Sequence, residues 1–502
     1  MKRRVLWTSA EPFGIVLFVL AFCLWILACL WVQGCGSSIP PEESSFRGPI
    51  VLITLSDLRA DLVASLGGET GWTPELDRFA AEAHFAQAGV TASSSPVPSI
   101  LSIATGTDPW QHGVLSHSSH QRSADLPTLG EMMSEMGFRT RLWAPLKAKG
   151  LARYGPFDGF QESRKISELL ASPSLLEEDS VSGPSFTWIH LPYVAFPYKD
   201  RRDALPRLQG RPIPEKNVVE KNQLLLFANP KIPLPSPLES SARELYRHEV
   251  AWADARVGEL LQILREGPDY DKSLIVITAL HGTELGERGQ TLFGQNLGRE
   301  SIAVPLLIKL PEGQEPAFPD PEGPVAVTRI WSTLAEMVDR PTAPAHLPSL
   351  FRQSSTPILS SLYGHGPLNR FSIIDQHHGE TYQAILNIPY SRPEPHFFAA
   401  QMVQAGWKKF PVKTPPKRMR RRMEKNFSAV PPLSGSRAVQ LTLEQWLDDG
   451  STREITESEL RSSFAEELEL RWRRFADLER NSNLEHKMRA LDQRLLQQSS
   501  NP

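Results

Sequence analysis

The sequence predicts an α/β protein with a mostly parallel β-sheet that is sandwiched by helices. Two observations predict this class: short apolar runs typical of buried strands recur along the chain, and a long amphipathic stretch precedes one of them. Strands that alternate with helices are typical of parallel sheets, because each parallel pair needs a crossover connection. With 502 residues, of which 40% are hydrophobic, the chain can form one large domain and a smaller one.

Three apolar runs are the predicted strands. Residues 49–55 (PIVLITL) are rich in β-branched side chains, as expected for a strand that is buried on both faces of a parallel sheet. Residues 273–278 (SLIVIT) and 304–308 (VPLLI) have the same character. Residues 245–267 form the predicted helix, with apolar side chains at helical spacing at Val250, Ala253, Val257, Leu260, Leu261 and Leu264.

Charge and cysteine content exclude two classes of protein. The chain has 54 basic and 57 acidic side chains and a net charge of −3, so it lacks the positive charge of a nucleic-acid-binding protein, and we expect no nucleic acid as partner. All three cysteines, Cys23, Cys29 and Cys35, lie in or beside one N-terminal apolar segment. The rest of the chain therefore cannot be a disulfide scaffold, and its stability must come from packing.

The N-terminal apolar segment predicts attachment to a membrane. Residues 13–32 carry no charge and are long enough to cross a bilayer as a helix. Three basic residues precede them and two glutamates follow the segment, so the positive-inside rule places the N-terminus in the cytoplasm and the bulk of the chain outside it. In a bacterium the bulk would be periplasmic.

This organisation divides the N-terminal region into three parts. We expect a cytoplasmic basic segment over residues 1–12, a single-pass anchor over 13–35 and a polar linker over 36–48. Two other interpretations stay open. In the first, the segment is a secretory signal that is cleaved off. In the second, it is a lipoprotein-type signal, and Cys35 of the sequence VQGC receives the lipid.

Three motif-bearing stretches accompany the predicted strands. Residues 51–83 (VLITLSDLRADLVASLGGETGWTPELDRFAAEA), 93–114 (SSSPVPSILSIATGTDPWQHGV) and 274–289 (LIVITALHGTELGERG) together resemble the sulfatase family of the alkaline-phosphatase-like superfamily. In that family the first strand ends in two aspartates, the nucleophile segment reads C-x-P-S-R or T-x-P-S-H, and the later motif reads DHGEELGEHG. Order and separations agree from residue 49 to about residue 309.

The resemblance implies a fold, a reaction and a metal. It implies an alkaline-phosphatase/sulfatase-like domain with a mixed, mostly parallel sheet over residues 49–350, and a smaller C-terminal α+β subdomain over 351–450. It also implies hydrolysis of sulfate or phosphate esters by a formylglycine, serine or threonine nucleophile beside one or two divalent cations. Carboxylate ligands suit calcium, whereas mixed oxygen and imidazole ligands suit zinc or manganese.

Most positions that would carry this chemistry hold unsuitable residues. The replacements are Ser56 for the first aspartate, Pro96 for the nucleophile, Ile100 for the following arginine or histidine, Leu280 for the later aspartate and Thr283 for the first glutamate. Of the metal ligands only Asp57 and His281 remain, fewer than the three of catalytic zinc or the six to eight of calcium. We therefore expect no cofactor; if one is present, it is a divalent calcium, manganese or zinc ion.

The remaining polar residues have structural interpretations beside the functional ones. If Asp57 is not a metal ligand, we expect it to cap the following helix. If His281 is not a ligand, we expect a buried imidazole that is hydrogen-bonded to the backbone. Ser95 and Ser99 are candidate displaced nucleophiles, although no base lies nearby in sequence, and helix capping before Pro98 is the alternative.

A second group concerns the substrate region. Lys147 and His190 are candidates for an anion-binding pocket, unless the lysine is only solvated. His190 belongs to a segment that resembles the family's W-x-H-x-x-D-x-H-x-P-Y, in which Tyr193 and Ala195 replace the aspartate and the second histidine.

The C-terminal third carries two further features. Residues 413–425 form a basic run that meets anionic lipid head groups or remains a solvated loop. Residues 451–497 form a predicted helical segment, opened by a capping box at 456–459. Its apolar stripe packs on the domain or binds a partner helix and consists of Leu460, Phe464, Leu468, Trp472, Phe475 and Leu478.

Two functional hypotheses follow. The first is a membrane-tethered, extracytoplasmic sulfatase-like protein that is catalytically inactive and binds an anionic ligand or a partner. The second is an active sulfuric-ester or phosphoester hydrolase or transferase with an atypical metal site. The number of metal ligands decides between them, because fold alone does not establish activity.

Overall fold

The computed structural model describes residues 45–86, 88–115, 122, 125–145, 154–178, 183–209, 234–314, 323–340, 347–354, 356, 358–362, 368–377, 379–389, 440–448 and 451–455. The chain divides into two units, residues 1–46 and 47–502, and only the second is considered below. The predicted anchor, Lys147, the basic run 413–425 and the C-terminal stripe lie outside the described residues. Within the described residues no helix is long and apolar enough to span a bilayer.

A seven-stranded sheet forms the centre of the fold. Its strands follow the order β2-β11-β7-β1-β6-β4-β5. The five strands from β7 to β5 are parallel, whereas β11 is antiparallel to β7 and β2 is antiparallel to β11. The bounds are β1 (Ile50–Leu55), β2 (His84–Phe85), β4 (Arg139–Ala144), β5 (Glu162–Lys165), β6 (Ser185–Leu191), β7 (Leu274–Ala279) and β11 (Leu306–Lys309).

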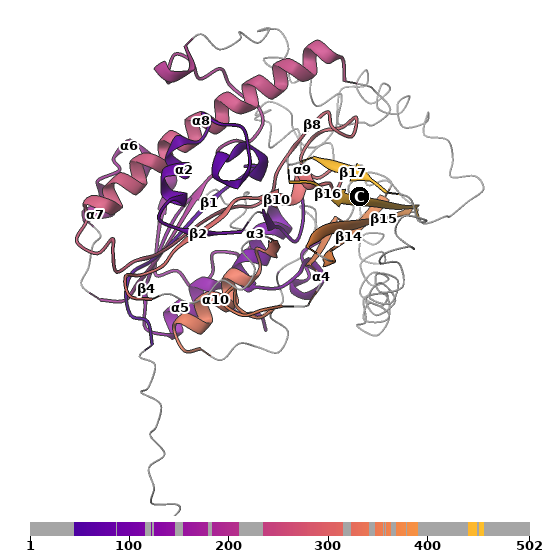
Figure 1. Cartoon of the computed structure of the whole chain (residues 1–502). Helices are drawn as coiled ribbons and strands as arrows, with labels where there is room; N and C mark the ends of the chain where they lie inside the picture. The colour runs from indigo at the N-terminus through magenta and orange to yellow at the C-terminus, as the bar shows by residue number, and fades with distance from the viewer. Residues whose placement is uncertain are drawn as a thin grey trace, which may run out of the picture. The chain divides into compact units, whose positions relative to one another are not determined.

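Two helical layers cover this sheet, as predicted. Figure 1 shows α2 and α8 over one face and α3, α5 and α10 over the other. The helices are α2 (Pro74–Ala80), α3 (Pro96–Thr105), α4 (Pro109–His112), α5 (Leu129–Glu135), α6 (Ile166–Ala171), α7 (Leu175–Glu178), α8 (Ser236–Glu266), α9 (Arg299–Ile302) and α10 (Arg329–Met337). The mixed, mostly parallel α/β class is therefore confirmed.

Burial follows position in the sheet. Every residue of the central strands β1, β6 and β7 is buried, which is why these strands consist mainly of apolar and β-branched residues. The edge strand β5 has the sequence ESRK, and its side chains alternate between half-buried and exposed. Charged side chains on such an edge discourage pairing with a second chain.

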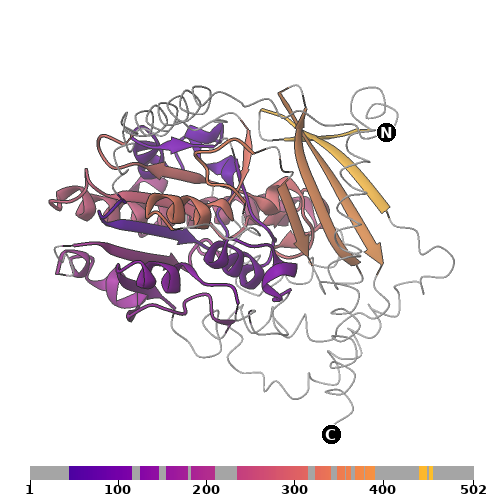
Figure 2. The same cartoon turned by 90° about the horizontal axis from the view of Figure 1, so that it is seen from below.

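Three smaller sheets complete the described structure. A three-stranded sheet contains β3 (Ala88–Val90), β10 (Ala303–Val304) and β12 (Pro324–Ala326), and a hairpin contains β8 (Glu284–Leu285) and β9 (Thr291–Leu292). Towards the C-terminus, where the smaller α+β subdomain was predicted, five antiparallel strands form a sheet, in orange and yellow in Figure 2. They are β13 (Ile358–Leu362), β14 (Leu368–His377), β15 (Glu380–Pro389), β16 (Gln440–Trp446) and β17 (Thr452–Glu454). The predicted domain boundaries remain predictions.

Candidate functional site

The first and later motifs meet where β1 and β7 end. Because these strands are parallel neighbours in register, their carboxyl ends lie at one edge of the sheet. The pairing continues past the strands: Leu280 N donates to Leu55 O at 2.9 Å, and His281 N donates to Ser56 O at 3.2 Å. The fold therefore brings together Ser56, Asp57, Leu280 and His281, as the motif alignment predicts.

Asp57 is a buried carboxyl group without a hydrogen bond to its Oδ2 among the described residues. Its Oδ1 lies 3.5 Å from His281 Nε2. Burial raises the pKa of Asp57 well above its ordinary value and so favours the protonated form. The capping interpretation is wrong, because the short 3-10 helix Ala60–Leu62 begins after Arg59 without a side-chain cap.

His281 is fixed by the backbone. Its Nδ1 lies 2.7 Å from Gly282 O, so Nδ1 carries the proton and donates it to that carbonyl. Nε2 is then the unprotonated nitrogen, and it faces Asp57. The Phe293 ring packs against the imidazole, with a centroid separation of 5.0 Å. This agrees with the structural interpretation of His281 as a buried imidazole bonded to the backbone.

The described residues do not fit a divalent cation. No three histidine, cysteine, aspartate or glutamate side chains among them gather closely enough to hold a metal ion. Leu280 is fully buried, and the hydroxyl of Thr283 lies 3.3 Å from the hydroxyl of Tyr198. Asp57 and His281 are thus left as two ligands, below the number that zinc or calcium requires.

The helix of the nucleophile segment begins with two prolines. Pro96 and Pro98 are the first and third residues of α3, which follows the N-cap residue Ser95. Neither proline has an N–H group, and Ser99 N donates to Ser95 O at 3.1 Å. Of the first three helical residues only Val97 retains an amide donor. A helix N-terminus binds anions through such amides, so this one is a poor anion site.

The serines around Pro96 are buried. Ser93, Ser94, Ser95 and Ser99 are at most 1% exposed. The Ser99 hydroxyl donates to Ser93 O at 2.6 Å, and Ser95 N donates to Ser93 Oγ at 3.4 Å. Ile100, at the position of the family's arginine or histidine, is fully buried. The structure therefore gives neither Ser95 nor Ser99 access to a substrate.

A serine–histidine pair that sequence reasoning did not single out also lies in this region. Ser102 Oγ lies 3.1 Å from His112 Nε2. Val114 N donates to His112 Nδ1 at 3.2 Å, so Nε2 carries the proton and the serine accepts it. Burial lowers the pKa of His112 to about 3. Because this imidazole donates to the serine, it cannot act as the base that activates it.

His190 is buried beside the central strand. Its Nδ1 lies 3.0 Å from Thr54 Oγ1, which also accepts a hydrogen bond from Trp188 Nε1 at 2.9 Å. Burial lowers the pKa of His190 to about 4, so the imidazole is neutral at pH 7. It supplies no positive charge to an anion-binding pocket, and the other candidate, Lys147, lies outside the described residues.

The segment after His190 has a constrained backbone. Val194 is fully buried and has a φ of 69°. A β-branched residue rarely adopts this left-handed conformation, which is typical of functional loops. At the aspartate position, the Tyr193 ring instead packs edge-on against Trp252 on α8, with centroids 4.4 Å apart.

Comparison with known proteins identifies the family. The sulfatase family model matches residues 49–340, more than half of the chain. The chain belongs to the sulfatase family. It is 30% identical to the choline-sulfatase of Rhizobium meliloti (strain 1021) over 132 residues, which cover 25% of this chain and 26% of that protein. It is 21% identical to the human iduronate 2-sulfatase over 357 residues, 57% of this chain and 64% of that one.

The two relatives are matched over only part of their length, and two solved structures resemble the chain in fold. The chain spans less than two thirds of the length of either relative. A putative sulfatase from Bacteroides thetaiotaomicron has a TM-score of 0.54 at 14% identity, with 76% of this chain and 90% of that chain covered. A 2-O GAG sulfatase has a TM-score of 0.52 at 14% identity with the same coverage. At such identities the likeness concerns the sulfatase fold alone.

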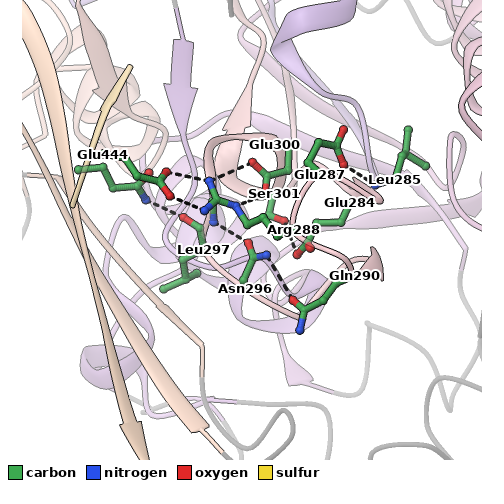
Figure 3. Close-up of polar contacts among 12 residues, drawn as sticks. Glu284, Leu285, Glu287, Arg288, Gln290, Asn296, Leu297, Glu300, Ser301 and Glu444 are labelled. Atoms are coloured by element: carbon green, nitrogen blue, oxygen red, sulfur yellow. Dashed lines mark hydrogen bonds and ion pairs between the residues drawn. The ribbon is translucent and has the colours of Figure 1, made fainter. Parts of the chain in front are cut away.

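In this sulfatase-family chain Arg288 lies between two carboxylates from distant parts of the sequence (Figure 3). Its Nη2 donates to Glu444 Oε2 at 2.7 Å, and its Nη1 pairs with the other oxygen of that carboxylate. Its Nε donates to Glu300 on α9. Arg288 belongs to the later sulfatase motif and Glu444 to β16. This guanidinium therefore links the motif to the C-terminal sheet.

A second buried carboxylate lies beside this link. Glu284 is fully buried, and its Oε1 accepts a hydrogen bond from Ser301 Oγ at 3.2 Å. Burial, and then the nearby Glu300 carboxylate, raise the pKa of Glu284 well above its ordinary value. Burial would raise the pKa of Glu287 too, yet Arg59 and Arg243 outweigh it and lower that pKa to about 2. The sequence-based prediction missed this network.

Proposed function

We propose that this sulfatase-family protein is a membrane-tethered, extracytoplasmic protein that does not hydrolyse esters and acts by binding. The proposal rests on the residues at the aligned positions: the nucleophile position holds Pro96, buried as the first residue of α3, and among the described residues the ends of β1 and β7 offer only Asp57 and His281 as candidate ligands. Proline has no group that can attack an ester. Two protein ligands do not suffice for a catalytic divalent ion.

The alternative, an active sulfuric-ester or phosphoester hydrolase or transferase, asks more of the chain. It needs a nucleophile and further metal ligands from outside the described residues. It also needs a path for water and substrate to Asp57 and His281, which are 2% and 0% exposed. We therefore place this alternative second.

The charge balance near the site favours a protein partner over an anionic ligand. Arg59 forms ion pairs with Asp61 and Glu287, and Arg288 forms ion pairs with Glu300 and Glu444. Each of these guanidinium groups is already neutralised, so neither offers a free charge to a sulfate or phosphate group. A binding surface for a protein does not need such a charge.

Metal content tests the inactive state. We expect the purified protein to hold less than about one divalent ion per chain after dialysis, because Asp57 and His281 alone bind calcium, manganese or zinc weakly. Elemental analysis measures this. Stoichiometric metal in the parent that is lost in Asp57→Ala, but kept in the surface control Asp269→Ala, would overturn the proposal and favour the active alternative.

Reporter fusion tests the proposed tether. We expect a reporter joined after Pro502 to be active only outside the cytoplasm, because the charges around residues 13–32 orient the segment. Cys35→Ser separates the two modes of attachment. A helical anchor tolerates this change, whereas a lipoprotein would accumulate as an unprocessed precursor of higher mass. Reporter activity in the cytoplasm would contradict both.

A further inference from the structure

The two faces of the C-terminal sheet differ in chemistry. Residues that pair directly across neighbouring strands share a face. Gln383 pairs with Ile374 and Glu444, and this face carries polar contacts to the rest of the protein. Gln383 Nε2 donates to Leu297 O at 2.6 Å, and the Glu444 carboxylate forms an ion pair with Arg288. This face is therefore the one that packs on the segment after the later motif.

The opposite face is apolar. Ala384 pairs with Ile373 and Leu443 across the sheet, and Tyr382, Ala384, Leu443 and Ile455 form one hydrophobic cluster. These side chains and Ile373 are only 2–8% exposed. Figures 1 and 2 show no described helix or strand over this side of the sheet. An open sheet face would expose such residues, so a covering layer must come from elsewhere in the chain or from a partner.

The end of the described chain points to that layer. Ile455 belongs to the apolar cluster, and its N–H donates to Leu443 O at 3.0 Å. The capping box at 456–459 follows immediately and opens the apolar stripe Leu460 to Leu478. The stripe therefore starts next to this apolar face.

The dimensions also match. A helix over residues 460–478 would be about 28 Å long at 1.5 Å per residue. Five strands spaced about 4.8 Å apart span roughly 19 Å, and a strand of ten residues such as β14 is about 33 Å long. A single helix laid diagonally can cover most of this face. Such a helix also gains the tertiary packing that it needs to be stable in water.

We infer that residues 456–478 form an amphipathic helix that packs its stripe on the apolar face made by Ile373, Tyr382, Ala384, Leu443 and Ile455. The competing occupant is the segment between β15 and β16, which leaves and rejoins the sheet at one corner, where Asn387 pairs with Gln440. That segment is interrupted by prolines and carries the basic run, whereas the stripe has an uninterrupted helical period. The stripe is thereby used within the chain and is not free to bind a partner helix.

Disulfide trapping in the full chain tests this inference. The three native cysteines all lie within residues 23–35, so replacing them with serine leaves a background without thiols in the exported part. Ala384→Cys, a small change in volume, is combined in turn with Phe464→Cys, Leu468→Cys or Trp472→Cys. After mild oxidation, peptide mass spectrometry measures the intramolecular disulfide. We expect at least one pair to link in most molecules, since a disulfide needs Cβ atoms about 4 Å apart.

Two controls make the outcome decisive. Glu466 lies on the polar side of the predicted helix, so Ala384→Cys with Glu466→Cys should link in few molecules. Met402→Cys reports on the competing segment. Linking to position 402 but not to the stripe, equal linking to position 466, or disulfides only between chains would each overturn the inference. Leu443→Cys repeats the series from a second sheet position, in case Ala384→Cys lowers the melting temperature.

Discussion

Restoring two carboxylates should convert the residual ligand pair into a metal site. In Ser56→Asp with Leu280→Asp, two carboxylates join Asp57 and His281 at the ends of β1 and β7, where the backbone pairing continues through Ser56 O and His281 N. Four ligands suffice for zinc, and carboxylates suit calcium or manganese. We expect the melting temperature of this double variant to rise with added metal, whereas the parent barely responds.

The expected size of this effect has two parts. Leu280 is fully buried, so replacing it with a charged group should destabilise the metal-free protein by a few kcal/mol through lost packing and uncompensated charge. A bound ion then stabilises the folded state by about 2.7 kcal/mol when its concentration is 100 times its Kd. Thermal unfolding with and without calcium, manganese or zinc measures both parts.

A matched control separates charge from volume. Ser56→Asn with Leu280→Asn has side chains of nearly the same size but lacks the carboxylates, and it should show the destabilisation without the response to metal. If the aspartate variant folds and metal does not stabilise it, the side chains at positions 56 and 280 do not converge, and the alignment of this site is wrong. Pro96→Thr, added to a variant that binds metal, should yield trace cleavage of an aryl sulfate or aryl phosphate.

The sequence predicted two of the three central strands, β1 and β7, but not β6 (Ser185–Leu191). The runs 49–55 and 273–278 agree with β1 and β7 within one residue, because strands buried on both faces must be continuously apolar. The strand β5 (Glu162–Lys165) was missed, since a charged edge strand carries no apolar signal. The run 304–308 was predicted as one strand, but Val304 ends β10 in the three-stranded sheet and Leu306 begins β11 in the central sheet. An apolar run also does not encode that β11 is antiparallel to β7.

Some features of the candidate site and its surroundings were predictable from the sequence, and others were not. The convergence of Asp57 and His281 was predictable, because parallel neighbouring strands end at one edge of a sheet. Helix α8 began nine residues before the predicted start, at Ser236, because its first turns lack apolar periodicity. The pair of Arg288 and Glu444 was not predictable, since the two residues are 156 positions apart and meet only when the C-terminal sheet docks.

That pair leads to the second large effect. Arg288→Met keeps the length of the side chain but leaves the carboxylates of Glu300 and Glu444 buried without their cation. Removing one partner of a buried ion pair costs about 3–5 kcal/mol, mainly because the remaining charge is uncompensated. We expect the free energy of unfolding at pH 7, measured by urea denaturation, to fall by this amount, with β14–β16 losing amide-exchange protection first.

The loss should depend on pH and on the partner carboxylates. Burial raises the pKa of Glu300, and removing Arg288 raises it further, so this carboxyl is neutral over a wider acid range. A protonated carboxyl needs no cation beside it. The stability that Arg288→Met loses relative to the parent should therefore be smaller at pH 5 than at pH 7. Adding Glu444→Gln, which removes one uncompensated charge, should restore part of the stability at pH 7.

The control is Arg78→Met. Arg78 is 62% exposed and forms an ion pair with Glu75, and such exposed pairs contribute less than about 1 kcal/mol. If Arg288→Met costs no more than Arg78→Met, the ion pair does not hold the C-terminal sheet against the sulfatase motif, and apolar packing alone must do so.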